Sequence, residues 1–321
     1  MDINTDFPLV SVVIPTLNRP DFIKETLDSV INQTYRNLEI IISDNGSNYD
    51  VKEYLKTYFS NDSRIIFRKN KYTILPALHF NQCLEFASGK YFIIICDDDF
   101  ISNNFIELLV KEFEINPNLS IGLTKNNQIN ESSELIKENQ IVPWKIKNGK
   151  IFLDDWLKGN EIAPVSSFIS LFANRVTLLK SGGFPNFQDA SHSDNASAIN
   201  LALRGDVLFL NDIIFSYRVY KQSFGLKLNY SSLSKASREF VNYFKKNEFL
   251  RTQYDKKKRN EIIKGVKELC FKTYITRLRS NYNLKGIKFL KGLINYKLTL
   301  FEFAYSIKMI KIKISKMHFN D

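Results

Sequence analysis

The chain has 321 residues, of which 44% are hydrophobic and 13% aromatic, so its composition is that of a globular protein rather than a disordered one. Its three cysteines are widely spaced and form no CxxC pair, which predicts neither a disulfide framework nor a zinc site and indicates a reducing compartment. Because no run of about 18 apolar residues occurs and the N-terminus lacks a basic start, we expect neither a spanning helix nor a signal peptide.

Charge is unevenly distributed along the chain. The formal net charge is +11, but residues 221–321 contain 24 Lys/Arg against 7 Asp/Glu, a net charge of +17. Residues 1–220 contain 21 Lys/Arg against 27 Asp/Glu, a net charge of −6. An acidic front and a basic back predict two functional surfaces rather than one.

The first 117 residues alternate between short apolar runs and amphipathic segments. We expect strands at residues 9–16, 38–43, 64–68 and from 91 onward. Helices are expected from Pro20, at 51–59, at 75–87 and at 103–116. This alternation predicts an α/β fold with a right-handed, mainly parallel sheet and helices on both faces.

The pattern is less regular after residue 123. We expect hairpin or loop structure at 126–149, strands at 166–173, 207–210 and 213–217, and helices at 175–181 and 193–204. From residue 231 onward the pattern is helical with Lys-rich faces, and the chain contains no internal repeat.

Three consecutive carboxylates, Asp97, Asp98 and Asp99, follow the apolar run that begins at Tyr91. Ligands of open α/β sheets bind outside the carboxyl ends of the strands. Three acids at such a place repel one another, and a divalent cation is the simplest way to offset that repulsion. The alternative is that Asp99 or Ser102 only caps the next helix.

The glycine motifs of the common nucleotide folds are absent. No GxGxxG follows the first strand and no GxxxxGK[ST] occurs, which disfavours a dinucleotide oxidoreductase and a P-loop enzyme. The first loop, residues 15–19, also lacks the Gly-rich, Arg-containing pattern of a sugar nucleotidyltransferase.

Three segments together resemble the inverting family 2 glycosyltransferases, which have the GT-A fold. The first is VSVVIPTLNRPDFIKETLDSVINQTYRNLEIIISDNGS, and the second is HFNQCLEFASGKYFIIICDDDFI, with a DxD-type motif. The third, GGF followed by HSDNASAINLALRG, resembles the acceptor-side segment. The resemblance covers about residues 8–220 and is strongest over the first 110. It implies a GT-A domain at 1–225, with a nucleotide-sugar half (1–110) and an acceptor half (111–225), before a basic helical region at 226–321.

The resemblance also implies roles for single residues. Asp44 is expected to accept the N3–H of uracil or thymine, Asp97 to face the ribose, and Asp98 to bind Mn²⁺ or Mg²⁺ directly, with Asp99 as an additional ligand or neighbour. The cation would bridge the two phosphates of the donor. The nucleotide-sugar-binding set implied in this way is Pro15, Thr16, Asn18, Arg19, Asp44, Asn81, Asp97 and Arg218.

Asp194 is the expected general base, which would take the proton of the acceptor hydroxyl. A helix N-terminus favours the ionised form of such an acid. Two alternatives stay open: Asp189 is the base, or Asp194 or Ser193 is only a helix cap. His192 is interpreted as an acceptor-pocket or surface residue rather than a ligand.

The segment Tyr217–Tyr220 departs from the family pattern, because many relatives have Tyr-Arg-x-His there. No metal-binding histidine is therefore assigned, although Arg218 and Lys221 could meet phosphate charge. Trp144 and Trp156 are interpreted as core or lid anchors, or as stacking platforms for a sugar.

Basic amphipathic helices are predicted in the C-terminal third by KKKR at 256–259 and by the spacing of Lys308, Lys311, Lys313 and Lys316. Such helices lie on anionic membrane surfaces. Nucleic-acid binding is the rival interpretation, disfavoured because no recognition motif is present. The third interpretation of these basic helices is a solvated face without a partner.

The sequence thus predicts a cytoplasmic glycosyltransferase, peripheral at the inner face of the cytoplasmic membrane. It would move a sugar from a UDP- or dTDP-sugar to a lipid-linked saccharide acceptor in O-antigen or capsule assembly. The alternatives are a non-catalytic nucleotide-sugar-binding protein and a basic nucleic-acid-binding protein.

Overall fold

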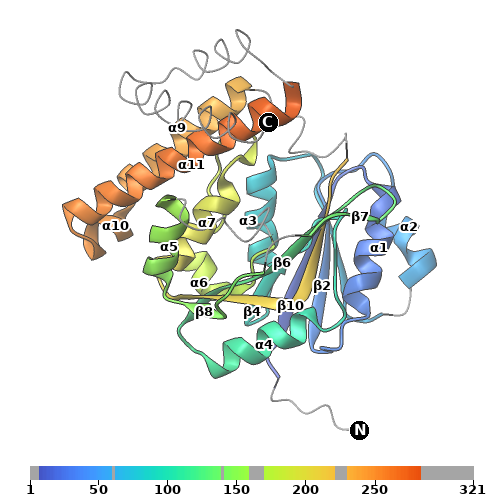
Figure 1. The fold of residues 1–321 in the computed structure, drawn as a ribbon. Helices are drawn as coiled ribbons and strands as arrows, with labels where there is room; N and C mark the ends of the chain where they lie inside the picture. Colours follow the sequence, from blue (N-terminus) through green and yellow to red (C-terminus); the bar gives the residue numbers. More distant parts are fainter. Residues whose placement is uncertain (1–6, 60–61, 139–140, 159–169, 221–229, 283–321) are drawn as a thin grey trace, which may run out of the picture.

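The computed structural model describes residues 7–59, 62–138, 141–158, 170–220 and 230–282. These residues form two β-sheets with helices packed on their faces, as Figure 1 shows. The fold class predicted from the alternating pattern, an α/β fold with a parallel-rich sheet, is confirmed.

The first sheet has the strand order β3-β2-β1-β4-β9. Its strands β1 (Val10–Thr16), β2 (Leu38–Asp44), β3 (Ile65–Lys69) and β4 (Tyr91–Ile94) are mutually parallel, and β9 (Ala173–Asn174) adds an antiparallel edge. Since parallel strands end at the same side of a sheet, the residues after β1, β2 and β4 meet at one edge.

Three helices connect β1 to β4 in turn, and a fourth, α4, leads to the second sheet. They are α1 (Pro20–Ile31), α2 (Val51–Phe59), α3 (Pro76–Phe86) and α4 (Phe105–Ile115). Helices α1 and α3 begin with proline at the first helical position, where the missing N–H costs nothing. The buried faces of these helices and of the sheet form two hydrophobic clusters.

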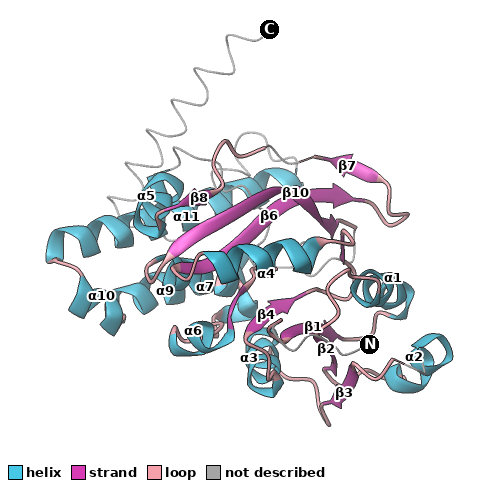
Figure 2. Ribbon diagram, turned by 90° about the horizontal axis from the view of Figure 1, so that it is seen from below, coloured by secondary structure: helices cyan, strands magenta, loops and turns pink. Residues whose placement is uncertain are grey.

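The second sheet has the order β5-β10-β6-β7. Its long strands β6 (Leu119–Ile129) and β10 (Asp206–Arg218) run parallel beside each other, as Figure 2 shows. The short strand β5 (Phe100–Ile101) pairs with β10, β7 (Leu135–Lys137) with β6, and β8 (Ile146–Lys147) with β10, all antiparallel. Strand β5 follows the three carboxylates directly, so both sheets flank them.

Two sequence predictions need correction here. The two strands expected at 207–210 and 213–217 are one strand, β10, with a register shift between Leu210 and Ile214. The Asn211 side chain bonds the backbone of Val142 on both its N–H and its carbonyl, so the polar interruption is a bulge and not a turn. A strand was also expected at 166–173, but 166–169 lie outside the described residues, and β9 begins at Ala173.

Helix α5 (Gly149–Lys158) was not predicted, whereas α6 (Arg175–Lys180) and α7 (Ser193–Ala202) were. A short 3-10 helix, η1 (Gln188–Ala190), precedes α7. Trp156, on α5, is buried in the first hydrophobic cluster, and Trp144 packs edge-on against Phe152 and Phe209. Both tryptophans are therefore core anchors.

The described part of the basic C-terminal region is packed on the rest of the molecule. It consists of α9 (Tyr230–Lys246), α10 (Glu248–Gln253) and α11 (Lys256–Tyr282), and Figure 1 shows α11 running past α9 and α5. Phe240, Phe244 and Val266 belong to the same buried cluster as sheet residues such as Phe92. Within the described ranges, no helix has the length and hydropathy needed to cross a bilayer. Lys308, Lys311, Lys313 and Lys316 lie outside the described residues.

Candidate functional site

The carboxyl ends of β1, β2 and β4 bring the predicted polar residues to one edge of the first sheet. Thr16 and Asp44 are register partners at the ends of β1 and β2. The Arg19 Nη1 atom, in the loop after β1, donates to Asp97 Oδ1 at 3.1 Å and to Asp98 Oδ2 at 2.6 Å. One guanidinium therefore faces two carboxylates.

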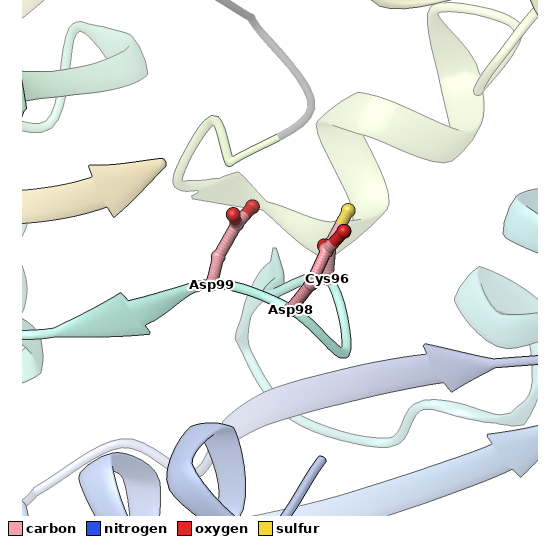
Figure 3. A group of neighbouring side chains, drawn as sticks. All are labelled: Cys96, Asp98 and Asp99. Carbon is pink, nitrogen blue, oxygen red and sulfur yellow. The ribbon is translucent and has the colours of Figure 1, made fainter. Parts of the chain in front are cut away.

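The carboxylates lie on a tight turn. The Asp99 N–H donates to the Cys96 carbonyl at 3.0 Å, which closes the turn. Figure 3 shows the side chains of Cys96, Asp98 and Asp99 on the same side of this turn, and their potential ligand atoms all lie within 4.8 Å of one another. Asn104 occupies the N-cap position of α4, without a side-chain capping bond, so the alternative that Asp99 or Ser102 is its N-cap is wrong.

Burial and the neighbouring negative charges disfavour ionisation of Asp97 and Asp99. Desolvation, opposed by Arg19 and reinforced by Asp98, raises the pKa of Asp97 to about 6. The pKa of Asp99 is raised well above its usual value by burial and then by the Asp98 charge. The donor set fits a divalent cation such as Mg²⁺ or Mn²⁺, because crowded carboxylate oxygens are the ligands that such hard ions prefer.

Asp44 has one occupied and one available oxygen. Its Oδ1 accepts the Ser47 N–H at 2.7 Å. Its Oδ2 is buried and accepts no hydrogen bond from the described residues, and Lys69 Nζ forms an ion pair with it at 3.5 Å. A buried acceptor without a donor is costly, so this oxygen suits an N–H of a ligand.

Asn18 connects the two loops beside Asp44. Its N–H donates to Ser47 Oγ at 2.9 Å, and its Oδ1 accepts the Asn48 N–H at 2.9 Å. Its backbone is left-handed, with φ 56°, a conformation that asparagine tolerates better than most residues. Pro15 and Thr16, expected in this loop, are the last two residues of β1.

Arg218 lies on the other side of the turn and is fully buried. Its Nε donates to the Asp98 carbonyl at 2.8 Å and its backbone N–H to Asp99 Oδ1 at 2.9 Å. Its Nη1 donates to the carbonyls of residues 130 and 131, and its Nη2 pairs with Glu25. Because these groups occupy the guanidinium, the structure favours a positioning role for Arg218 over the predicted contact with phosphate.

Asn81 likewise contacts the protein through its amide. Its Nδ2 donates to the Phe184 carbonyl and its Oδ1 accepts the Phe184 N–H, both at 2.8 Å. Gly183 is required here, since its φ is +57° and a Cβ would lie 2.3 Å from Asn81 Oδ1. Ser193 Oγ donates to the Pro185 carbonyl at 2.6 Å, so Asn81 and this turn together fix the start of α7.

The two candidate bases stand close together in sequence. Asp194 is the second residue of α7, is half-buried, and its Oδ1 accepts the Asn195 N–H at 2.8 Å. The N-cap of α7 is His192, so the alternative that Asp194 or Ser193 caps this helix is wrong. Asp189 has a left-handed backbone with φ 53°, and its Oδ1 accepts from Gln188 Nε2 at 2.9 Å.

Three residues near the site have contacts that sequence reasoning missed. The Tyr220 hydroxyl donates to Asp98 Oδ2 at 3.1 Å, and Cys96 belongs to the carboxylate turn. His79 Nε2 lies 2.8 Å from Ser43 Oγ, next to Asp44, and desolvation lowers the pKa of His79 to about 4, against the effect of the Asp44 charge. His192, which the sequence did single out, is buried and so is not a surface residue; its ring centroid lies 5.0 Å from that of Phe240 on α9 in a stacked arrangement.

Comparison with known proteins identifies the class to which this chain belongs. Residues 11–172, half of the chain, match the model of glycosyl transferase family 2. The chain therefore belongs to glycosyltransferase family 2, as the sequence motifs predicted.

Two relatives illustrate the range of similarity. An uncharacterized glycosyltransferase of Haemophilus influenzae is 25% identical, and the alignment covers 97% of this chain and 98% of that protein. An uncharacterized glycosyltransferase of Methanocaldococcus jannaschii is 34% identical over 147 residues, 45% of this chain. The chain spans about half the length of that archaeal relative, 51%.

Solved structures share the fold at low sequence identity. Residues 1–349 of S. aureus TarS superpose with a TM-score of 0.63 at 14% identity, over 89% of this chain and 78% of that one. The mannosyltransferase PcManGT of Pyrobaculum calidifontis, solved with GDP-Man and Mn²⁺, gives a TM-score of 0.55 at 17% identity, over 94% and 84%. The predicted GT-A fold is therefore confirmed.

Replacing Arg218 by methionine tests its positioning role. Arg218→Met removes the buried cation and leaves several carbonyls without donors, so we expect a loss of about 3–5 kcal/mol in the free energy of unfolding. Urea denaturation measures the loss. Arg36→Met, at an exposed arginine, is the matched control and should stay within about 0.5 kcal/mol of the parent. Equal, small effects of both substitutions would contradict the role.

His79 makes stability depend on pH. Its pKa falls from 6.5 to about 4 on folding, so the unfolded chain binds a proton that the folded chain rejects. The contribution is fully present above pH 6.5 and is lost as the pH falls toward about 4, by about 3 kcal/mol in total. His79→Gln, which keeps a polar partner for Ser43, should flatten the pH dependence of urea midpoints in this window. An unchanged slope would contradict the assignment.

Proposed function

We propose that the protein is a metal-dependent, inverting glycosyltransferase that uses a UDP- or dTDP-sugar as donor. The observation that supports this best is the convergence of Arg19, Asp44 and the Asp97–Asp99 turn at the carboxyl ends of β1, β2 and β4. Each group has the chemistry to meet one part of such a donor, and the family supplies the reaction class.

The base of the donor would be recognised by Asp44. Ser47 fixes its Oδ1, so the buried Oδ2 is held in place to accept the N3–H of uracil or thymine. A TarS structure contains UDP-GlcNAc, and this fold neighbour superposes with a TM-score of 0.54. Asp97, whose Oδ1 contacts Arg19, would face the ribose.

The diphosphate would lie between Arg19 and the carboxylate turn. Arg19 is held over Asp97 and Asp98, and its guanidinium can turn to phosphate oxygens while remaining a partner of the acids. Asp98 and Asp99 would hold Mn²⁺ or Mg²⁺, which when bound supplies charge stabilisation for the departing nucleoside diphosphate. Tyr220 and Arg218 keep Asp98 and Asp99 in position.

The acceptor would be activated by Asp194. Its carboxylate takes the proton of the acceptor hydroxyl as that oxygen attacks the anomeric carbon, and the bond to the diphosphate breaks with its electron pair leaving on the nucleotide. Attack opposite the leaving group inverts the anomeric centre. The N-terminus of α7 favours the ionised form of Asp194.

The acceptor itself is proposed to be a lipid-linked saccharide in O-antigen, capsule or related polysaccharide assembly. The net charge of +17 in residues 221–321 supports docking at an anionic membrane, at the inner face of the cytoplasmic membrane. In this proposal residues 1–225 transfer the sugar, and the region from 226 onward holds that domain at the membrane where the acceptor lies.

A donor screen tests the proposed function. Thermal shift and hydrolysis assays with UDP-, dTDP- and GDP-linked sugars should show a preference for one uracil or thymine donor, in the presence of Mn²⁺ or Mg²⁺. Asp98→Ala and chelation should each abolish metal-dependent turnover. If the protein binds a donor but neither hydrolyses nor transfers it under any metal condition, the non-catalytic alternative is favoured. If it binds nucleic acid more tightly than anionic vesicles, a nucleic-acid-binding protein is favoured.

Substitution of each candidate base, Asp194 or Asp189, distinguishes between them. Asp194→Asn should lower kcat by about 10²–10⁴-fold with the donor Kd unchanged, because only proton transfer is removed. Asp189→Asn is the matched control, five residues away, and should retain most of the activity. Transfer rates for the acceptor and calorimetric donor affinities check both variants. If Asp189→Asn lost turnover and Asp194→Asn did not, the base would be Asp189.

A further inference from the structure

Cys96 is the one thiol that the structure places beside the carboxylates. The turn closed by Asp99 N–H and the Cys96 carbonyl brings its Sγ atom within 4.8 Å of carboxylate oxygens of both Asp98 and Asp99. The side chains of these three residues point to the same side of the turn (Figure 3). Such separations allow one ion to contact all three after small side-chain movements, given metal–sulfur distances of about 2.3 Å and metal–oxygen distances of about 2.0–2.2 Å.

The turn has more acidic side chains than contacting cations. Asp97, Asp98 and Asp99 are all buried, and Arg19 is the cation whose side chain contacts two of them. The Arg218 guanidinium, by contrast, pairs with Glu25 and with backbone carbonyls. A divalent cation at this place therefore meets a net attraction, and the thiol adds a donor of different chemistry.

We propose that Cys96 Sγ is a third protein ligand of the cation at Asp98 and Asp99 and that it shifts the metal preference toward thiophilic ions. This inference rests on the metal site of the proposed function. Carboxylate oxygens alone select hard ions such as Mg²⁺ and Mn²⁺, whereas a thiolate raises the affinity for Zn²⁺ and Cd²⁺. On coordination the thiol gives its proton to solvent, and the sulfur binds as thiolate.

Arg19 is the internal competitor for this site. Its Nη1 lies 2.6 Å from Asp98 Oδ2, so an ion that binds this oxygen must displace it, whereas an ion on the other Asp98 oxygen need not. An ion that binds only oxygens gains two carboxylates in this exchange, whereas a thiophilic ion gains a sulfur as well. We therefore expect Cd²⁺ and Zn²⁺ to bind more tightly than Mg²⁺ even when no nucleotide sugar is present.

The other two cysteines provide a test within the parent protein. Cys83 and Cys270 are fully buried, at 0% and 1% exposure, whereas Cys96 is partly exposed. Iodoacetamide should therefore alkylate the native full-length chain first at Cys96, and mass spectrometry of peptides identifies the site. We expect Cd²⁺ and Zn²⁺ to protect Cys96 at concentrations at which Mg²⁺ does not.

The second test measures metal binding directly by calorimetry and by ultraviolet absorption of the cadmium–thiolate bond. Cys96→Ser should remove the absorption and weaken Cd²⁺ binding at least about tenfold. Substitution of groups that only hydrogen-bond to a metal ligand already weakens metal binding by about that factor. Mg²⁺ affinity should be unchanged. Cys270→Ala is the matched control and should retain the parent absorption and affinity.

Two results would overturn the inference. One is Cd²⁺ binding by Cys96→Ser with the parent affinity, and the other is alkylation of Cys96 at the same rate with and without Cd²⁺. Neither would touch the proposed function, which depends on donor turnover and on Asp98. Conversely, a protein that binds Cd²⁺ through Cys96 but turns over no nucleotide sugar would retain this metal site and lose the proposed reaction.

Discussion

The buried guanidinium of Arg218 is the interaction on which the geometry of the site depends. It joins α1 through Glu25, the β6–β7 hairpin through the carbonyls of residues 130 and 131, and the carboxylate turn through the Asp98 carbonyl. A cation taken out of water in this way is stable only when it is well paired, and each guanidinium nitrogen of Arg218 has a partner. The second sheet thus holds the turn that follows the first sheet, and neither sheet alone would fix Asp98 and Asp99.

The same turn shows why acids can be concentrated at this place. Burial and mutual repulsion raise the pKa of Asp97 and Asp99, which means that the folded chain holds these groups in an unfavourable electrostatic state. Arg19 offsets part of that cost through its contacts with Asp97 and Asp98. Because Arg19 neutralises these acids only in part, the site is suited to bind a further cation. The crowding of the buried carboxylates therefore both costs free energy in the free protein and prepares the site for a cation.

The sequence could predict the first sheet because its strands are continuous apolar runs that end in polar residues, as at Asp44. It could not predict partners, since a motif gives the position of a side chain but not what it contacts. Asn81 and Arg218 were therefore expected at the donor, although their polar groups bond the protein. Two strands were predicted where β10 is one, because a bulge interrupts an apolar pattern just as a strand end does, and the contact of Asn211 with Val142 is long-range.

The C-terminal helices are connected to the candidate base by packing rather than by charge. His192, two residues before Asp194, adopts a left-handed backbone and stacks on Phe240 of α9, while its Nε2 lies 3.1 Å from Ser237 Oγ. On its other side, the start of α7 is bonded to the Phe184 turn that Asn81 holds. The position of Asp194 is therefore set jointly by α3 and by α9. In the proposed reaction, a basic region that docks on the acceptor's membrane is built into the same core as the residue that deprotonates that acceptor.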